Sequence, residues 1–449
     1  MHVVFCFIEC LAVVFNGMIR RVVVMSVGML MSSIVLMGIT SCQKDDVTMS
    51  EVLSKDDNSV GEDSLSEIND TSNGLPIIRI VTPNGFKIYN RDDYMDDANI
   101  TVLDKNLNEM LTQKVKIRGR GNTSWFLMPK KSYKIKFYEP HSLFGEAEDK
   151  EWVLIANYCD KTMIRNALAY KMGYDSNLDY TTSFHFVDLE LNGEKQGTYM
   201  VAEQVKASKS RVDVGNDGFL VVVEAHASND DVTFGISSLP VPVTLKHPKV
   251  LKDSDEVEYV QTYIQEASDV LFGNKFLDAD VGYGRYFDIN SFVDWYLINE
   301  ISRNSDAIMY ASCYMNFRRG GKIKMGPIWD FDIAFGNVNY NECWNAEGFW
   351  VKNKNSYYVR MFHDSEFVNK LKERMNYFYT HKQQYLDFID EMAGILYKSQ
   401  EANEQIWHVI NEDVWPCYVV CGSYEGEIDR LKTWLSNRMD WMQNEIQGM

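Results

Sequence analysis

Two aspartates one residue apart, Asp330 and Asp332, occupy the stretch KMGPIWDFDIAFGN, which runs from Lys324 to Asn337. Trp329 precedes them and apolar residues surround them, so the sequence predicts a partly buried setting for both carboxylates. Buried like charges repel each other, and a divalent cation with oxygen ligands is the usual compensation. We therefore interpret both residues as candidate metal ligands. The alternative is that one of them caps a turn and the other is solvated.

A β-hairpin predicted just before these aspartates would position them. Residues 310–317 alternate between polar and apolar types, the glycines at 320–321 are a turn signal, and residues 322–328 form a second extended run. If the two glycines form the loop, Asp330 faces Ala311 across the strand pair. The aspartates would then lie at the open end of the hairpin.

Two more polar side chains are predicted at that open end, because Asn304 and Asp306 directly precede the first strand. The spacing of strands and their rise per residue should bring Asp306, Asp330, Asp332 and Asn304 within about 10 Å of one another. We accordingly predict a metal site formed by Asp330, Asp332 and Asn304, with Asp306 beside it.

A basic loop with two glycines is the second candidate site. In VKIRGRGNTSW, Gly119 and Gly121 alternate with Arg118 and Arg120 at the end of a predicted strand. Glycines let backbone N–H groups approach an anion closely, and the arginines add positive charge. The spacing does not match Gly-x-Gly-x-x-Gly, and Gly-x-Gly alone is a weak signal.

Two lysines follow this loop on the returning strand, in PKKSYKIKF. Lys134 and Lys136 alternate with Tyr133, Ile135 and Phe137, so the lysines share one face of the strand and the apolar residues share the other. Either lysine alone is typical of a solvated strand. Beside the glycine loop, the pair predicts a site for phosphate groups.

The order of these features along the chain is that of protein kinases. A glycine loop and a strand lysine come first, followed by a candidate base, Asp306, then a hairpin and a candidate metal ligand, Asp330. The signature motifs of conventional kinases are absent. The layout still favours phosphoryl transfer.

The elements that must position these residues change type along the chain. From residue 76 to about residue 224 the pattern has mostly period two, which indicates short strands and hairpins. One helix is predicted there, with Asp160 as its cap and Gly173 near its end. From about residue 253 the apolar residues recur at helical spacing. The sequence thus predicts an α+β fold with two lobes, β-rich at about 76–250 and mainly helical at about 251–449.

Composition excludes one class of partner. The chain has 449 residues, a formal net charge of -19 and 45% hydrophobic residues, which is enough to fill a large core. Its charge argues against nucleic acid as a partner, because contacts with phosphate backbones need a basic surface.

The beginning of the chain predicts export. Arg20 and Arg21 precede an apolar run at 22–39, and small residues lead to Cys42. This ending resembles that of bacterial lipoproteins, which implies a signal peptide at 1–41, a lipid on Cys42 and attachment to the outer membrane, on the cell surface or the periplasmic face. A membrane-spanning anchor is the alternative. The acidic residues 42–75 contain too few large apolar side chains to fold and are predicted to be a disordered tether.

Six motifs together resemble the CotH kinase family, the atypical protein kinases of the spore-coat type. In order, they are RGRGNTSW, PKKSYKIKF, WVLIANYCDKTMIRN, ELNGEKQGTYMVAEQVK, DWYLINEISRNSDA and KMGPIWDFDIAFGN. The resemblance implies a CotH-like kinase domain at 76–449, with an atypical kinase fold that uses ATP and Mg²⁺ to phosphorylate Ser or Thr of an unidentified protein.

The resemblance also implies roles for the candidate residues. Asp306 would accept the proton of the substrate hydroxyl, Asp330 would hold Mg²⁺, and Asp332 would be the second candidate ligand. Lys134 or Lys136 would pair with the phosphates. The loop made of Arg118, Gly119, Gly121 and Asn122 would cover them. Glu203 could orient the lysine or lie near the nucleotide, and burial as an ordinary charge at a strand end is the alternative for it.

Two departures from kinases keep other functions open. Kinases carry an Asn five residues after the catalytic Asp, whereas this chain has Ala311, so Asn304 would have to serve instead. ATP is also scarce outside the cell, which leaves room for an unusual donor, for action before export or for a reused fold. The alternatives are a metal-dependent nucleotide-sugar glycosyltransferase and a catalytically inactive surface adhesin or glycan-binding module.

Overall fold

The computed structural model describes residues 72–228, 230–417 and 419–449. The predicted signal peptide, Cys42 and nearly all of the predicted tether lie outside these residues. Within the described ranges, no helix is both long enough and apolar enough to cross a membrane.

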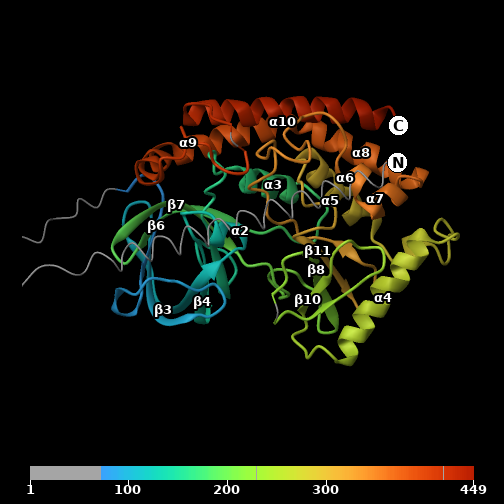
Figure 1. Cartoon of the computed structure of the whole chain (residues 1–449), viewed down its shortest axis with the longest axis horizontal. Helices are drawn as coiled ribbons and strands as arrows, with labels where there is room; N and C mark the ends of the chain where they lie inside the picture. Colours follow the sequence, from blue (N-terminus) through green and yellow to red (C-terminus); the bar gives the residue numbers. More distant parts are fainter. Residues whose placement is uncertain (1–71, 229, 418) are drawn as a thin grey trace, which may run out of the picture. The chain divides into compact units, whose positions relative to one another are not determined.

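The first part of the described chain closes into a β-barrel (Figure 1). Its strands follow the spatial order β1-β2-β3-β4-β5-β7-β6, and β1 closes the barrel by pairing in parallel with β6. The strands are β1 (Ile77–Val81), β2 (Met95–Leu103), β3 (Glu109–Arg120), β4 (Ser132–His141), β5 (Asp149–Ile155), β6 (Phe184–Leu191) and β7 (Glu194–Glu203). A short 3-10 helix, η1 (Pro83–Gly85), follows β1, and α2 (Thr123–Phe126) follows β3.

The barrel encloses its own apolar core. The predicted alternation in β4 is confirmed, because Tyr133, Ile135 and Phe137 are buried inside while Lys134 and Lys136 are only partly buried. Trp125 of α2 also belongs to this core. The loop after β3 is therefore anchored to the barrel.

A separate sheet follows the barrel in sequence. Its spatial order is β12-β11-β8-β10-β9, with β8 (Gly218–Val223), β9 (Thr233–Phe234), β10 (Val243–His247), β11 (Cys313–Arg318) and β12 (Lys324–Met325). The predicted hairpin is thus present as β11 and β12, and β8, from the predicted β-rich half, pairs with it along the whole of β11.

The predicted register of the hairpin is wrong by one residue. Met315 pairs with Met325, so the loop is centred on Gly320 instead of lying between two glycines. The backbone N–H of Gly321 donates to the carbonyl of Arg318 at 2.8 Å, which closes the turn. The second strand is also shorter than predicted, because it ends before Gly326. Asp330 therefore lies in a loop beyond the strand ladder.

Helices make up most of the remaining chain, as the helical periodicity predicts. α3 (Arg165–Tyr174) begins where the carboxylate of Asp160 accepts from the backbone N–H of Arg165 at 2.9 Å. The later helices are α4 (Asp255–Phe272), α5 (Ile289–Ile301), α6 (Val351–Lys354), α7 (Ser356–Met361), α8 (Ser365–Thr380), α9 (Lys382–Trp407) and α10 (Tyr424–Gln447), with a 3-10 helix η2 (Tyr283–Arg285) before α5. The described fold is accordingly a mixed α+β fold.

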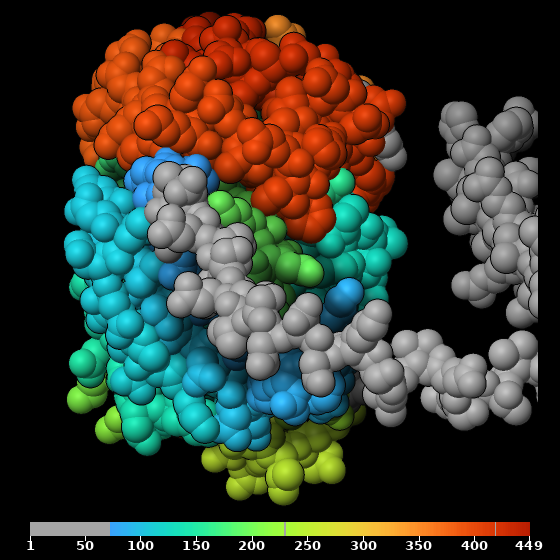
Figure 2. Space-filling view, turned by 90° about the vertical axis from the view of Figure 1, so that its left-hand side faces the viewer, coloured from blue at the N-terminus to red at the C-terminus, as the bar shows by residue number. Residues whose placement is uncertain are grey.

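The long helix α9 packs against strand β7 of the barrel. Lys130, at the entry to β4, is fully buried and donates to Asn403 of α9 at 2.8 Å and to the carbonyl of Thr198 in β7. Trp407 donates to the carbonyl of Gln196 at 2.9 Å. Figure 2 shows the C-terminal residues, coloured orange to red, gathered above residues of the first part of the described chain, coloured blue to cyan. These contacts join the barrel to the helical part.

Candidate active site

A cavity of about 600 Å³ brings together side chains from the barrel, the second sheet and the loops before and after the hairpin. Most of the residues singled out in the sequence line it. The charged and amide side chains in its wall include Arg91, Arg118, Arg120, Asn122, Lys134, Glu224, Asp306, Asp330 and Asp332.

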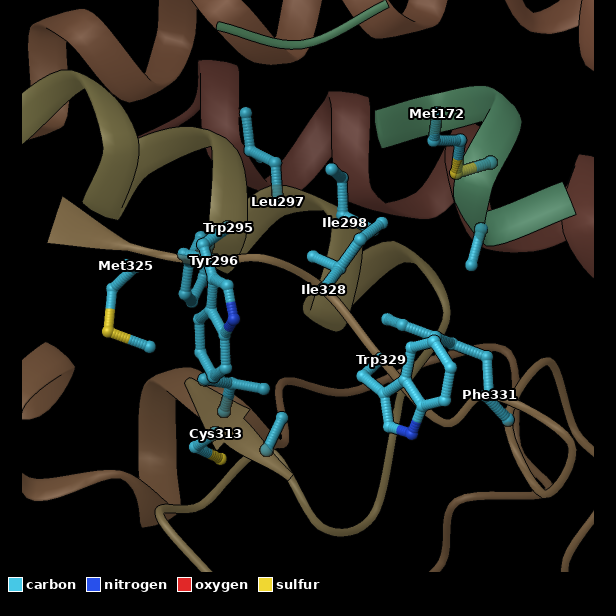
Figure 3. Packing of buried hydrophobic residues seen from close by; sticks show 14 of the residues in the cluster. Met172, Trp295, Tyr296, Leu297, Ile298, Cys313, Met325, Ile328, Trp329 and Phe331 are labelled. Atoms are coloured by element: carbon cyan, nitrogen blue, oxygen red, sulfur yellow. The ribbon is translucent and has the colours of Figure 1, made fainter. Parts of the chain in front are cut away.

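The Asp330 segment is held in place by its two aromatic neighbours. Trp329 and Phe331 are buried in the main apolar core, where Figure 3 shows them near Ile328. The backbone N–H of Phe331 also donates to the side chain of Asn166 in α3 at 2.7 Å. Asp330 itself has a φ of 71°, a left-handed conformation that costs free energy in a non-glycine residue and persists only where the surroundings enforce it. The core thus fixes the backbone that carries Asp330.

Asp330 and Asp332 differ in how the protein engages them. Asp330 lies deep in the fold but its surface is open to the cavity. Burial raises its pKa, while the charge of Arg120 and a hydrogen bond from Ser312 lower it. Burial also raises the pKa of Asp332 to about 7, helped by the charge of Asp330. The thiol of Cys159 lies 3.1 Å from the Asp332 carboxylate and donates to it. Asp330 is therefore the more available of the two.

Asp306 enters the cavity from the loop after α5. Its backbone N–H donates to the side chain of Asn304 at 3.1 Å, and the Asn304 amide in turn lies 3.3 Å from Asn299 of α5. Burial, followed by the charges of Asp330 and Glu224, raises the pKa of Asp306 to about 7. A carboxylate with such a pKa is suited to accept a proton near neutral pH.

Asn304 is buried and does not line the cavity. Its side-chain oxygen is already used by the backbone of Asp306. In this structure it positions Asp306, and the metal-ligand role predicted for it has no support from its placement.

Glu224 is a cavity carboxylate that the sequence analysis missed. It directly follows β8, and its carboxylate accepts from the backbone N–H groups of His226 at 3.0 Å and Ser312 at 3.3 Å. Burial raises its pKa. Nothing in the local pattern marks it, because only the pairing of β8 with β11 brings it beside Ser312.

Lys134 is the lysine that reaches the cavity, and its partner is Glu151 of β5. Its ammonium lies 3.3 Å from the Glu151 carboxylate, whereas that of the more exposed Lys136 lies 3.9 Å away and Lys136 is not part of the cavity wall. Burial lowers the pKa of Lys134 to about 8, although the charge of Glu151 opposes this. Glu151, and not Glu203, is thus the carboxylate that pairs with Lys134.

Glu203 lies at the end of β7, outside the cavity wall. Its carboxylate accepts from the hydroxyl of Tyr180 at 2.7 Å and the backbone N–H of Ser183 at 3.1 Å, and it lies 3.6 Å from Arg211. These contacts give it a place in the framework around the cavity.

We expect Glu151→Gln to lower the pKa of Lys134 further, because the substitution removes the charge that favours the ammonium form. The neutral amine is the reactive form, so acylation of Lys134 at pH 7.5 should become faster. Peptide mapping after pulse labelling over a pH series would measure this. Glu139→Gln is the matched control, because exposed Glu139 pairs with Lys150 instead. An unchanged titration of Lys134 in Glu151→Gln would contradict the assignment of this pair.

One glycine of the loop packs against the barrel core, and the other faces the cavity. A Cβ on Gly119 would lie 2.4 Å from the Trp125 ring, so this glycine is needed for the close approach of the indole. Gly121 has a φ of 94°, which only glycine adopts readily, and it lines the cavity with Asn122. Arg91 donates to the Gly121 carbonyl at 2.6 Å and to Asn122 at 3.3 Å. The loop is therefore held before any ligand arrives.

Only a few of the described side chains in the cavity are available to bind a metal ion. Among the described residues, no group of three or more His, Cys, Asp or Glu side chains is arranged to hold a metal ion. Asp330 and Asp332 nevertheless offer hard oxygen donors to the same cavity. Because Mg²⁺ in nucleotide sites is commonly bound by one or two carboxylates together with phosphates and water, this pair fits such an ion.

Comparison with known proteins found one family match. A family model described as CotH kinase protein matches residues 117–442, which is most of the chain. A search of curated proteins found no match.

Proposed function

The chain belongs to the CotH kinase family, and from this premise we propose that it transfers the γ-phosphoryl group of ATP to Ser or Thr of a protein. The observation that carries the proposal is the shared cavity of Asp306, Lys134, Asp330 and Asp332 beside a basic loop. Membership of this family indicates a kinase-like protein, and proteins of the family generally use ATP. The acceptor and the use of Mg²⁺ are parts of the proposal.

In the proposed reaction, Asp306 is the base. The acceptor oxygen bonds to the γ-phosphorus, the bond from that phosphorus to the bridging oxygen of ATP breaks, and ADP leaves. The hydroxyl proton passes to Asp306, whose pKa of about 7 allows it to receive a proton near neutral pH. Asn304 fixes the backbone of Asp306 and thereby its carboxylate.

The remaining cavity residues bind and orient the donor. Lys134, held by Glu151, would contact the phosphates from the barrel side. Asp330 and Asp332 would hold Mg²⁺, which when bound neutralises phosphate charge. Ala311 has no side-chain oxygen, so it cannot replace the Asn that kinases carry five residues after the catalytic Asp. Glu224 accepts from the N–H of Ser312, the next residue, and so brings a carboxylate there.

The order of the barrel, the second sheet and the later helices supports the proposed kinase function. In this proposal the barrel is the N-terminal lobe, and the second sheet with the later helices is the C-terminal lobe of a kinase domain at 76–449. Lipidation of Cys42 after removal of residues 1–41, with residues 42–75 as a tether to the outer membrane, is likewise proposed from the sequence. A membrane location would place the acceptor in the periplasm or at the cell surface.

Calorimetric titration with ATP tests the proposed function. We expect binding that strengthens when Mg²⁺ is added, followed by transfer of label from γ-labelled ATP to Ser or Thr of a mixed protein acceptor pool. A parallel titration with a nucleotide sugar separates the two donor classes. Absence of ATP binding with and without Mg²⁺ would overturn the proposal.

A further inference from the structure

Arg120 is a cavity residue for which the predictions above gave no role beyond the positive charge that it adds to the loop. It ends β3, directly before Gly121, and its guanidinium carbon lies 5.2 Å from the centre of the Trp329 ring. Within the part of the chain that the structure describes, its guanidinium makes no hydrogen bond or ion pair at contact distance. A planar cation stacked by its face keeps its N–H donors free along its edge.

The neighbouring arginines are already engaged. Arg91 donates to Gly121 and Asn122 of the loop. Arg118 donates to the carbonyl of Arg91 and lies over the ring of Tyr94 at 5.0 Å. Arg120 is thus the arginine of this cluster that makes no hydrogen bond to another residue of the described chain.

Arg120 also lies in the same cavity wall as Asp330, the residue next to its stacking partner. Trp329 and Asp330 are adjacent in sequence, so one segment supplies both the ring that holds the guanidinium and the carboxylate that attracts it. Arg120 comes from the barrel and this segment from beyond the second sheet, so the two face each other in the cavity.

We propose that Arg120, whose guanidinium lies over the Trp329 ring, is the residue that recognises the phosphate chain of the donor and selects di- and triphosphates over nucleosides. In the free protein the guanidinium offsets the charge of Asp330. When a phosphate chain enters, two N–H groups on its edge bind phosphate oxygens in a bidentate manner. This inference rests on the proposed function.

Arginine suits this role better than lysine. Its donors form a rigid fork that matches two phosphate oxygens, and its weakly hydrated face stacks on an indole. Lysine retains the charge but offers neither feature. Arg120→Lys therefore separates recognition by shape from simple charge attraction.

Titration of the purified protein in the presence of a metal chelator tests the inference without activity as the readout. The probes are inorganic tripolyphosphate, ATP and adenosine, and the variants are Arg120→Lys and Trp329→Phe. Arg319→Lys is the matched control, because Arg319 stacks on Tyr259 at 4.0 Å outside the cavity. Thermal melts of each variant report folding.

We expect Arg120→Lys to weaken tripolyphosphate and ATP binding by about tenfold or more, the range for hydrogen bonds to charged groups, and to leave adenosine binding unchanged. Trp329→Phe should show a smaller loss, and Arg319→Lys should match the wild type.

Each remaining outcome separates the inference from the proposed function. Equal binding of ATP by Arg120→Lys and the wild type overturns the inference and leaves ATP binding intact. Tripolyphosphate binding that depends on Arg120, without nucleotide binding either in the chelator or after Mg²⁺ is added, retains the anion site and overturns ATP as the donor. No binding of any probe, with the chelator and again with Mg²⁺, overturns both.

Discussion

Asp306→Asn is expected to lower kcat for phosphoryl transfer by about a thousandfold, within the range that general-base catalysis contributes. The amide is nearly the same size as the carboxylate but cannot accept the substrate proton. ATP affinity should be unchanged or slightly higher, because one negative charge leaves a cavity that must receive phosphates. Rapid-quench assays with labelled ATP and calorimetry measure the two quantities separately. Full retention of kcat would show that Asp306 is not the base.

Stability provides the control for this variant. The pKa of Asp306 in the folded protein, about 7, lies above its ordinary value of 3.8, so the wild type loses stability as the pH rises from about 4 to 7. Asn does not ionise and avoids this loss. At pH 8 the variant should therefore be more stable than the wild type, by on the order of 1–3 kcal/mol, and the difference should shrink towards pH 5. An inactive but stabilised variant excludes misfolding as the cause of lost transfer.

The sequence predicted the local features of the site well. The alternation in β4 correctly assigned Lys134 to the face opposite the barrel core, because period two follows directly from strand geometry. The polar residues around the hairpin were likewise predicted to converge, and Asp306, Asp330 and Asp332 do line one cavity. These results depend on short-range geometry that neighbouring residues determine.

Features that depend on pairing between distant strands could not be predicted. Glu151 becomes the partner of Lys134 only because β4 and β5 pair with Lys134 opposite Val153. Glu224 reaches the cavity only because β8 pairs with β11, about ninety residues later. A single sequence contains no signal for either register. Periodicity alone therefore assigns β8 to the same β-rich half as the barrel.

The error in the hairpin register has a physical cause. A Gly-Gly pair is compatible with loops of different length, and a change of one residue in the loop shifts every pair in the hairpin. The ligand role predicted for Asn304 stays a prediction, and the structure adds that its side-chain oxygen accepts from the backbone N–H of Asp306. Proximity in sequence does not show which way a side chain in a loop points.

Asp330→Asn is expected to abolish the part of ATP binding that depends on Mg²⁺, and Asp332→Asn to reduce it by a smaller factor. The difference follows from their surroundings, because Asp330 is open to the cavity whereas Asp332 already accepts a hydrogen bond from Cys159. Calorimetric titration of ATP at several Mg²⁺ concentrations would measure both effects. Asp92→Asn is the matched control, since Asp92 also lines the cavity but is largely exposed and pairs with Arg91 at 3.7 Å.

Asp330→Asn also has a second, independent expected effect, which is on the pKa of Asp306. The charge of Asp330 helps to raise the pKa of Asp306, so Asp330→Asn should lower that pKa. The stability of the variant should then depend less on pH between 4 and 7 than that of the wild type. Equal losses of Mg²⁺-dependent binding in Asp330→Asn and Asp92→Asn would show that general charge, and not a ligand at Asp330, attracts the metal. Retention of full Mg²⁺ dependence in Asp330→Asn would remove Asp330 from the metal site altogether.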